Sequence, residues 1–347
     1  MTHPHRRLAR LLLLTSAALT AAACGEPGTA PIISGDSRVA ITTLEQQRPA
    51  LFVGSLDGAT RTRVRFTGVT DSIPGNFADF QVKDANLLAL AAPAFSPDGR
   101  RVAVVATLAF DQSEVVVMNA DGTGGKVASV NSQSIGSDVA WSPDGTRVAY
   151  TMSTVPGFGG FDVFVTDVAA NTVTRLTMGA NVRVTAMRWS ADGRSVLYAH
   201  NTGTASNGDW TSEVVRVDAA TGASQVVASN IAGQISSIGV GGGRVLLTRL
   251  APLGGTRQLI EAVPGTSERM LVQSDAAHAH YLGGTDAFAL VVTATNVNGT
   301  IVNGHFVIDM LTGDTTGVRD VGPSGAVDVY YDALPLMSER ASRSTRS

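Results

Sequence analysis

Cysteine is almost absent from this chain of 347 residues, and Cys24 is the only one. A single thiol excludes an internal disulfide, so the fold must be stabilised by packing. Charged residues are also few, because Asp, Glu, Lys and Arg together make up 16% of the chain. The 26 basic and 29 acidic residues give a net charge of −3. This balance argues against a nucleic-acid partner, which would require a clustered basic face.

Common catalytic and metal-binding motifs are missing as well. The sequence contains no G-x-S-x-G, H-E-x-x-H, C-x-x-C or G-x-x-x-x-G-K-[ST] pattern, which argues against the hydrolases, zinc sites and phosphate-binding loops that these patterns mark. The glycine-rich segment 239–244 precedes a strand-like pattern rather than a helix, and we interpret it as a turn. The sequence therefore predicts no catalytic residue, no cofactor and no metal.

The first 23 residues have the composition of a secretory signal. Arg6, Arg7 and Arg10 precede an apolar run that ends in three alanines at 21–23. A basic start, a short apolar stretch and small residues at the cleavage site are the parts of such a signal. The apolar run is shorter than the roughly 20 residues that a membrane span requires.

The position of Cys24 resembles that of the lipidated cysteine in bacterial lipoproteins. Ala21 stands where that family more often has Leu, and Leu19 lies two residues upstream. The alternative is an ordinary signal cut after Ala23 that leaves Cys24 unmodified. Gly25 resembles the residue found in lipoproteins that are sent to the outer membrane. The resemblance implies a lipid anchor on Cys24, the cell envelope as location, and the periplasmic side of the outer membrane.

The rest of the chain divides into three parts by composition. Residues 24–35 are rich in Gly and Pro and are predicted to be a flexible tether, and residues 334–347 are predicted to be a disordered tail. Residues 36–333 between them are long enough for one large repeat domain.

A seven-residue sequence occurs three times within this central part, at 95–101, 141–147 and 189–195. Each copy places an aromatic residue at the end of an apolar segment and follows it with Ser-Pro-Asp-Gly or Ser-Ala-Asp-Gly. Proline fixes φ, aspartate bonds the local backbone and glycine tolerates a positive φ, so the sequence predicts a tight turn. The residues of this turn are Phe95, Ser96, Pro97, Asp98, Gly99, Trp141, Ser142, Pro143, Asp144, Gly145, Trp189, Ser190, Asp192 and Gly193.

Strand patterns flank each turn, and a second strand–turn–strand pattern follows. The unit is therefore four short strands repeated at a period below 50 residues, which is typical of radial arrays. Counting degenerate copies gives six units and predicts an all-β, six-bladed β-propeller of four-stranded antiparallel blades. A spare strand at 326–336 is expected to complete the first blade and close the ring. The 67–91 insert lengthens the first unit, and the sequence leaves open whether it belongs to a blade.

The aromatic-Ser-Pro-Asp-Gly turn resembles the WD40-like repeat of TolB-type β-propellers. The resemblance is strong at the three copies and extends by period over about residues 36–333. It implies a propeller fold and an envelope protein, and it specifies fold far better than task. The chain lacks the separate α/β domain that precedes the propeller in TolB, so a TolB-like role in envelope integrity does not follow.

The two rims of such a propeller differ in their predicted loops. One rim carries uniformly tight turns, whereas the other carries long irregular loops, where binding sites tend to lie. Phe158, Phe161 and Trp210 in these loops are candidate binding residues, with packing onto neighbouring blades as the alternative. His278 and His280 would share one side of a strand, yet nothing completes a metal site around them, so we interpret them as polar residues near the channel mouth and candidate contacts.

Three functions remain open at this point. The favoured hypothesis is a membrane-tethered, non-catalytic propeller that binds another envelope protein or a surface polymer. The second is an enzyme acting on a glycan or small molecule at the central channel, and the third is a periplasmic ligand sensor. Propeller enzymes assemble their sites from separate blades, so residue spacing alone cannot separate these readings.

Overall fold

Strands and short turns make up every part of the chain that the computed structural model describes. One 3-10 turn, Asp84–Asn86, interrupts them, and no α-helix occurs among the described residues. This confirms the all-β prediction. The predicted signal and tether and most of the predicted tail lie outside the described residues. The described residues are 38–55, 60–70, 81–109, 112–130, 135–153, 160–178, 184–203, 210–241, 244–250, 257–262, 269–274, 278–279, 288–297, 300–309, 315–318 and 330–334.

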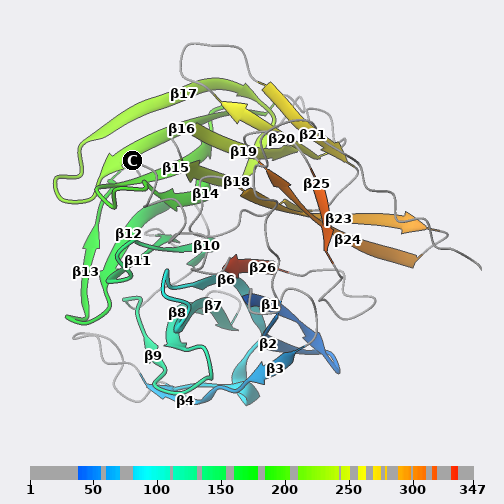
Figure 1. Ribbon diagram of the computed structural model, residues 1–347. Helices are drawn as coiled ribbons and strands as arrows, with labels where there is room; N and C mark the ends of the chain where they lie inside the picture. The colour runs from blue at the N-terminus through cyan, green and yellow to red at the C-terminus, as the bar shows by residue number, and fades with distance from the viewer. Residues whose placement is uncertain are drawn as a thin grey trace, which may run out of the picture. The chain divides into compact units, whose positions relative to one another are not determined.

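Within these residues the strands form six sheets, numbered here by their order along the chain (Figure 1). The first sheet has the order β26 (Tyr330–Leu334), β1 (Arg38–Glu45), β2 (Arg48–Ser55), β3 (Arg61–Val64). The second has the order β6 (Ala89–Phe95), β7 (Arg101–Ala109), β8 (Gln112–Asn119), β9 (Lys126–Val127), then β4 (Thr67–Thr70) and β5 (Gln81–Lys83). The third has the order β10 (Ile135–Trp141), β11 (Arg147–Ser153), β12 (Phe161–Asp167), β13 (Thr172–Arg175).

The remaining three sheets repeat this antiparallel order. The fourth contains β14 (Val184–Trp189), β15 (Ser195–Asn201), β16 (Thr211–Asp218) and β17 (Ser224–Ala232). The fifth contains β18 (Gln234–Gly241), β19 (Arg244–Leu250), β20 (Arg257–Ala262) and β21 (Arg269–Ser274). The sixth contains β22 (His278–Ala279), β23 (Phe288–Val297), β24 (Thr300–Asp309) and β25 (Thr315–Val318).

The first strands of five consecutive sheets contact one another. Contacts join β26 to β6, β6 to β10, β10 to β14 and β14 to β18. In Figure 1 these strands lie toward the middle of the drawing, whereas the last strands β13 and β17 lie at its periphery. We call the ends that carry the turns between first and second strands the first rim. The opposite ends, which carry the connections between second and third strands and between sheets, are the second rim.

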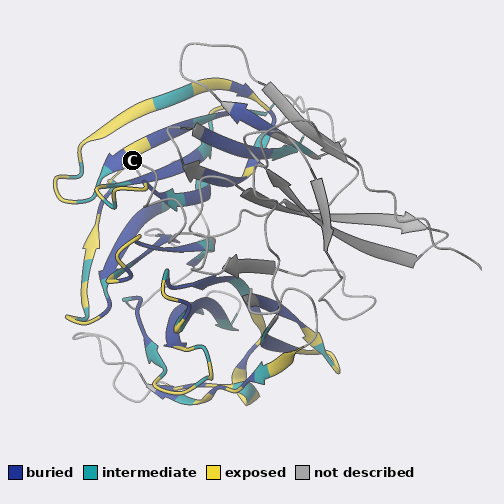
Figure 2. Cartoon of the chain, in the orientation of Figure 1, coloured by how far each residue is buried: buried dark blue, intermediate teal, exposed yellow. Residues whose placement is uncertain are grey.

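Apolar side chains cover both faces of the central strands. Four buried clusters each join the facing sides of two consecutive sheets, from the first sheet through the fifth. Strand β7, for example, has five successive buried residues, 102–106. A strand that is buried on both faces reads as a continuous apolar run rather than an alternating one. Figure 2 shows the consequence, with buried residues along the inner strands and exposed ones along β13 and β17.

The insert between the first two sheets belongs to a sheet. Strands β4 and β5 pair as a hairpin, and Thr70 of β4 pairs in parallel with Lys126 of β9, which extends the second sheet at its outer edge. Val69 and Val82 from this hairpin are buried in the cluster between the first and second sheets. The insert therefore adds two strands to an existing sheet instead of forming a separate one.

The repeated turn has the same hydrogen bonds in all three copies. In the second copy, the Arg147 N–H donates to Ser142 Oγ (2.9 Å), and Ser142 Oγ donates to Asp144 Oδ1 (2.5 Å). The Gly145 N–H donates to the Ser142 carbonyl (2.8 Å), and Gly145 has a φ of 71°, which glycine adopts without strain. The Thr146 N–H donates to Asp144 Oδ1 (2.9 Å). The aspartate bonds the local backbone and the glycine has a positive φ, while the hydrogen bonds of the serine hydroxyl are a contribution that the sequence analysis did not identify.

Residues of one repeated turn also contact the next repeated turn. The Arg147 guanidinium lies 4.6 Å from the ring centroid of Trp189 and donates to the Gly193 carbonyl (2.8 Å). The Trp189 indole N–H donates back to the Ala140 carbonyl (3.1 Å) at the end of the preceding first strand. The same three contacts join the second sheet to the third, through Arg101, Trp141, Gly145 and Ala94. The repeated residues therefore form the turn and also join neighbouring sheets.

This coupling predicts a specific loss of stability. Replacing Arg147 with Ala removes a charge-assisted hydrogen bond and a cation–π contact, so we expect the free energy of unfolding to fall by about 2 kcal/mol. Arg194 occupies an exposed position in the next turn and makes neither contact, so Arg194→Ala is the matched control. Urea unfolding of both variants checks the prediction, and equal losses from the two would contradict it.

The turn carboxylates predict a dependence of stability on pH. Burial raises the pKa of Asp144, but hydrogen bonds from Ser142 and Thr146 outweigh it, so the folded pKa lies below its ordinary value. The stabilisation is therefore present above the unfolded pKa of about 4 and is lost as the pH falls through the folded one. We expect the stability difference between the natural chain and Asp144→Asn to be largest at neutral pH and to shrink in acid. Urea unfolding at a series of pH values tests this, and a constant difference would refute it.

Candidate functional site

Exposed apolar side chains gather on the second rim. Leu44 (65% exposed) precedes the β1–β2 turn, Leu88 (61%) precedes β6, and Met178 (85%) follows β13. Among the described residues, the remaining large apolar side chain of this kind is Val226 on the outer strand β17. Single exposed apolar residues are normal, but a group of them on one side favours a contact surface.

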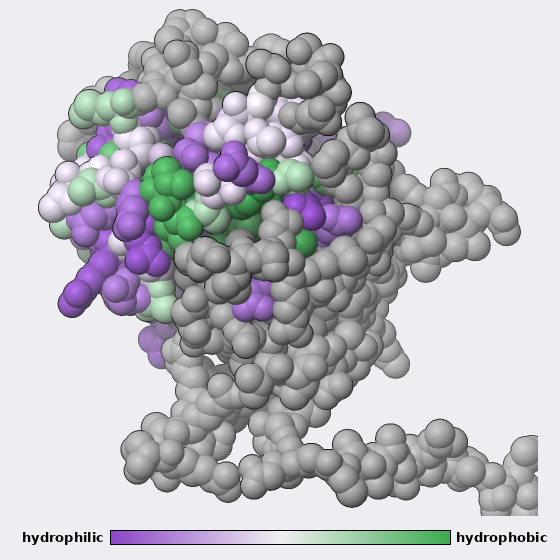
Figure 3. Space-filling model, turned by 90° about the horizontal axis from the view of Figure 1, so that it is seen from above, coloured by the Kyte–Doolittle hydropathy of each residue, from purple (hydrophilic) through white to green (hydrophobic). Residues whose placement is uncertain are grey.

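The surface outside the rim also contains apolar area. Val226 is 50% exposed. Figure 3 shows described apolar residues beside polar ones on the face seen from above. The first rim differs from the second, because its repeated turns present aspartates such as Asp98, Asp144 and Asp192.

The structure places two of the predicted binding aromatics on this rim. Phe161 begins β12 and Trp210 directly precedes β16, and both are half-buried. Phe158 and His280 lie outside the described residues. His278 is in β22, where it pairs with Val292. None of these positions is shown to contact a ligand, so their binding roles stay predictions.

The backbone around Trp210 is tied to the neighbouring sheet. The Gly233 N–H donates to the Trp210 carbonyl (2.7 Å), and Ser212 Oγ donates to the Gly233 carbonyl (2.8 Å). A Cβ at Gly233 would lie 2.2 Å from the Leu250 carbonyl oxygen, so only glycine fits this connection. The Nδ2 atom of Asn201, which lies beside these groups on β15, is buried and has no partner among the described residues. These contacts fix the Trp210 backbone where the fourth and fifth sheets meet.

Buried acids form a second repeated feature near this rim. Glu114, Asp162 and Glu213 each lie close to the start of the third strand of their sheet, 48 and 51 residues apart. Glu114 and Asp162 are 4% and 1% exposed. Sequence reasoning missed this set. The available signal was an acidic residue ahead of an apolar run at the same point of three repeats.

Hydroxyl groups satisfy the first two acids in the same way. Ser129 Oγ accepts the Val115 N–H and donates to Glu114. Thr177 Oγ1 likewise accepts the Val163 N–H (2.9 Å) and donates to Asp162 (2.9 Å), which also pairs with Arg175. These contacts bind the last strand of a sheet to its third strand, so we interpret both acids as structural.

The fourth sheet departs from this pattern. Its acid, Glu213, pairs with His200 Nε2 at 2.8 Å, and the two side chains are 23% and 12% exposed. The Tyr198 ring lies 5.9 Å from the His200 ring, and its pKa is raised by burial and then by the nearby Glu213 and Asp162. A phenol is protonated at neutral pH even at its ordinary pKa of about 10, so the Tyr198 hydroxyl is a hydrogen-bond donor there. The pair borders the rim without forming a recognisable catalytic set.

The first strands carry a further ion pair that the sequence did not reveal. Asp138 on β10 accepts the Met187 N–H (2.6 Å) and a contact from Arg188 Nη1 (3.2 Å), both on β14. Burial raises the pKa of Asp138, and Arg188 and the Met187 N–H oppose the rise. Asp138 thus satisfies a backbone donor of the neighbouring sheet. In β6, β10, β14 and β18 the charged residues are this one pair.

Two further features are absent from the described part of the chain. No group of three or more His, Cys, Asp or Glu residues there is arranged to hold a metal ion. Among the same residues, no helix has the length and apolar character of a membrane span.

Comparison with known proteins relates the chain to TolB. Its fold resembles the crystal structure of TolB from Acinetobacter baumannii (15% identity, TM-score 0.60, 87% of this chain and 67% of that one). It also resembles a structure assigned to TolB of Agrobacterium tumefaciens (16% identity, TM-score 0.54, 87% and 100%). The tricorn protease matches at 11% identity and a TM-score of 0.53, over 86% of this chain and 36% of the protease. No protein of curated function matches the sequence.

A family model described as PD40, the TolB β-propeller domain, matches residues 80–278. These residues are more than half of the chain, and they contain all three copies of the repeated turn. They also contain both sets of Arg–Trp contacts between sheets. The resemblance that the turns indicated is thereby confirmed, and the chain belongs to the PD40 family of TolB β-propeller domains.

Proposed function

We propose that this protein is a membrane-tethered, non-catalytic propeller of the bacterial cell envelope that binds another envelope protein through its second rim. The observation that carries the proposal is the presence of exposed apolar side chains on that rim, where the 85% exposed Met178 and the half-buried Trp210 are the contacts proposed for the partner. Exposed apolar side chains on a rigid scaffold favour a protein partner over a charged or hydroxyl-rich polymer, because burial of apolar area drives protein association.

We further propose that the six sheets are six blades of one closed ring. Two observations support this. The C-terminal strand β26 pairs with the N-terminal strand β1, so both ends of the chain share one sheet. Contacts between first strands already link five of the sheets in order. Such closure would protect the sheet edges that otherwise promote aggregation.

The tether is proposed from the leader and from Cys24. A lipid on this residue would confine the propeller to the membrane surface and raise its effective concentration near membrane partners. We propose a location at the outer membrane, facing the periplasm, because Gly25 resembles the residue that follows the lipidated cysteine in lipoproteins sent there. Membership of the TolB propeller family agrees with a location in the cell envelope.

A binding role agrees with the chemistry of the inner strands. Asp138 pairs with Arg188 and accepts the Met187 N–H. Both charged groups of these strands are therefore already engaged, which leaves little charge free for proton transfer there. The tricorn protease is an enzyme with a similar fold, but nearly two thirds of its chain lies outside the match. Propeller likeness therefore does not by itself favour catalysis.

Lipidation is directly testable. Cells that express the tagged chain are expected to incorporate labelled palmitate into it, and Cys24→Ser should abolish the label and release the protein from the membrane fraction. A chain that is exported but remains unlabelled would contradict the lipoprotein assignment and favour an ordinary signal.

The partner surface predicts a loss of capture by rim variants. Crosslinking in intact cells followed by affinity recovery should yield one envelope protein, and we expect Met178→Ser with Trp210→Ala to lower its yield about tenfold or more. Val226→Ser removes an equally apolar side chain away from the rim and is the matched control. Thermal unfolding confirms that each variant is folded. Equal losses in both variants, or no specific partner, would contradict the proposal.

A further inference from the structure

Cationic side chains cluster at the outer edge of the first sheet. Arg61, Arg63 and Arg65 alternate along β3 and the residue that follows it, so they project to the same side. Arg48 begins β2 next to the β1–β2 turn, and Lys83 ends β5 in the adjoining insert; both are exposed. The chain as a whole is slightly acidic, with a net charge of −3. A local basic group of this size therefore stands out from the average surface.

Two carboxylates hold part of this cluster in place. Arg63 pairs with Glu45 and lies 3.6 Å from Asp84, and Arg65 lies 3.2 Å from the same Asp84 oxygen. Asp84 also accepts the Phe66 N–H (2.9 Å), which fixes the insert against the first sheet. Two acids thus face five cations among the described residues, which leaves an excess of positive charge.

The remaining cations are available to a ligand. The Arg61 guanidinium stacks on Phe52 at 3.8 Å, and no ion pair of Arg61 is found among the described residues. Arg65 is 61% exposed despite its ion pair. No ion pair of Arg48 or Lys83 is found in the described part of the chain. These residues can contact anionic groups without first breaking a buried interaction.

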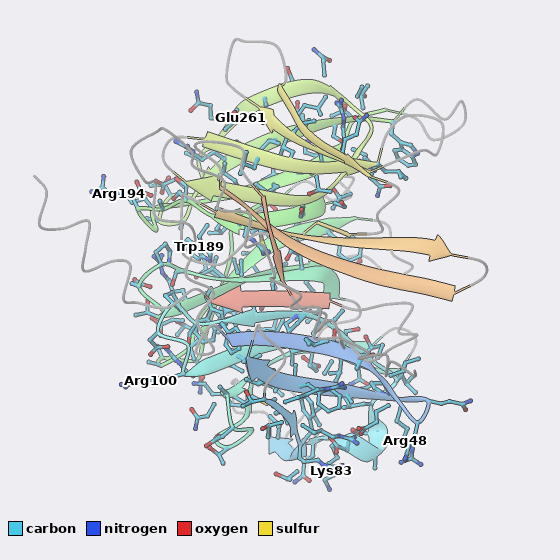
Figure 4. The ribbon with its side chains drawn as sticks, turned by 45° about the vertical axis from the view of Figure 1, so that its right-hand side comes forward. Arg48, Lys83, Arg100, Trp189, Arg194 and Glu261 are labelled. Atoms are coloured by element: carbon cyan, nitrogen blue, oxygen red, sulfur yellow. The ribbon has the colours of Figure 1, made fainter. Side chains whose placement is uncertain are left out.

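Two exposed leucines lie on the same rim as Arg48, and side-chain alternation along the hairpin places Leu44 on the opposite face from Arg48. Leu44 is next to Glu45 and pairs with Pro49 across the β1–β2 hairpin, and the Leu88 N–H donates to the Thr107 carbonyl at the entry to β6. Strands β1 and β2 both contact β6, so the two leucines lie at the same end of neighbouring sheets. In Figure 4, Arg48 and Lys83 lie at the lower end of the view, apart from Arg100 and Arg194 on its left side.

We propose that this Arg–Leu patch, formed by Arg48, Arg65, Lys83, Leu44 and Leu88, docks on a lipid surface that carries anionic phosphate headgroups. Guanidinium groups bind phosphate in a bidentate manner, and exposed leucines can enter the region between headgroups and acyl chains. A purely acidic protein or polymer would use the cations but would leave the leucines in water. The combination of both kinds of side chain therefore favours a membrane.

The site of the tether supports this choice. The proposal rests on the lipid anchor of the proposed function, and the 14 residues from Cys24 to the start of β1 can span at most about 50 Å. They lead into β1 at Arg38, at the opposite end of the first sheet from Arg48, and this reach exceeds the roughly 27 Å length of an eight-residue strand, so the tether is long enough for the patch to meet the bilayer. In Figure 1 the fourth sheet lies across from the first. Docking by the first sheet would leave Met178 and Trp210 open to a partner.

Vesicle binding tests the patch without the anchor. The chain from residue 24 onward with Cys24→Ser carries no lipid and keeps every described strand. It is sedimented with phosphatidylcholine vesicles, with and without phosphatidylglycerol, at low and high salt. We expect binding that requires the anionic lipid and weakens with salt. Arg48→Gln/Arg65→Gln/Lys83→Gln should weaken it about 100-fold, at roughly fivefold for each cation, and Leu44→Ser/Leu88→Ser about tenfold.

A charge-matched variant provides the control. Arg100→Gln/Arg194→Gln/Arg216→Gln removes three exposed arginines elsewhere, and it should change binding by no more than about twofold. An equal loss in this control overturns the patch, as does preferential binding of soluble polyglutamate over vesicles. If the Cys24→Ser variant does not bind vesicles while the natural chain incorporates palmitate in cells, the patch is overturned and the lipoprotein proposal stands. If the variant binds vesicles while the natural chain never incorporates palmitate, the patch is supported and the anchor is overturned.

Discussion

A sheet that is apolar on both faces is stable only when neighbouring sheets cover it, and here the second, third and fourth sheets are joined in turn by directional contacts as well as by apolar packing. The Arg147 guanidinium contacts the Trp189 ring and donates to the Gly193 carbonyl. The Trp189 indole N–H donates to the Ala140 carbonyl of the preceding sheet. That carbonyl belongs to a first strand, which pairs on one edge only with a strand among the described residues. The contact therefore positions two sheets and satisfies a backbone group that would otherwise lack a partner.

The repeated turn made much of this architecture predictable. Proline, aspartate and glycine at fixed offsets allow one backbone conformation, and the hydrogen bonds of Ser142 and Asp144 follow from it. The sequence analysis recognised the aromatic residue as part of the repeat but did not predict its hydrogen bond to the preceding sheet. Trp189 bonds a carbonyl 49 residues away, and no local rule connects these two positions. The 67–91 insert was ambiguous for the same reason, because a single pair between Thr70 and Lys126 decides where it belongs.

The candidate site was less predictable than the fold. Asp138 has meaning only beside Met187 and Arg188 of the next sheet, and the distance between these residues is set by packing rather than by spacing. The buried acids of the third strands do recur at a regular interval, yet their partners differ. Asp162 contacts Arg175 and Thr177, whereas the corresponding acid of the fourth sheet pairs with His200. A regular position in the sequence thus specifies a location while the surroundings specify the chemistry.

The Arg–Trp contacts between sheets end where the repeated turn loses its arginine and its aromatic residue. Ser195 occupies the position of Arg147, and the strand register places Val240 where the other sheets have an aromatic residue. The fourth and fifth sheets are joined instead by an apolar cluster that includes Leu197 and Ile235. Apolar contact is non-directional, whereas hydrogen bonds restrict orientation. The junction beside Trp210 keeps hydrogen bonds of another kind, because the Gly233 N–H donates to the Trp210 carbonyl (2.7 Å) in the connection between the two sheets. The repeated turn therefore orients the sheets before this point, and the connecting backbone orients the sheet after it.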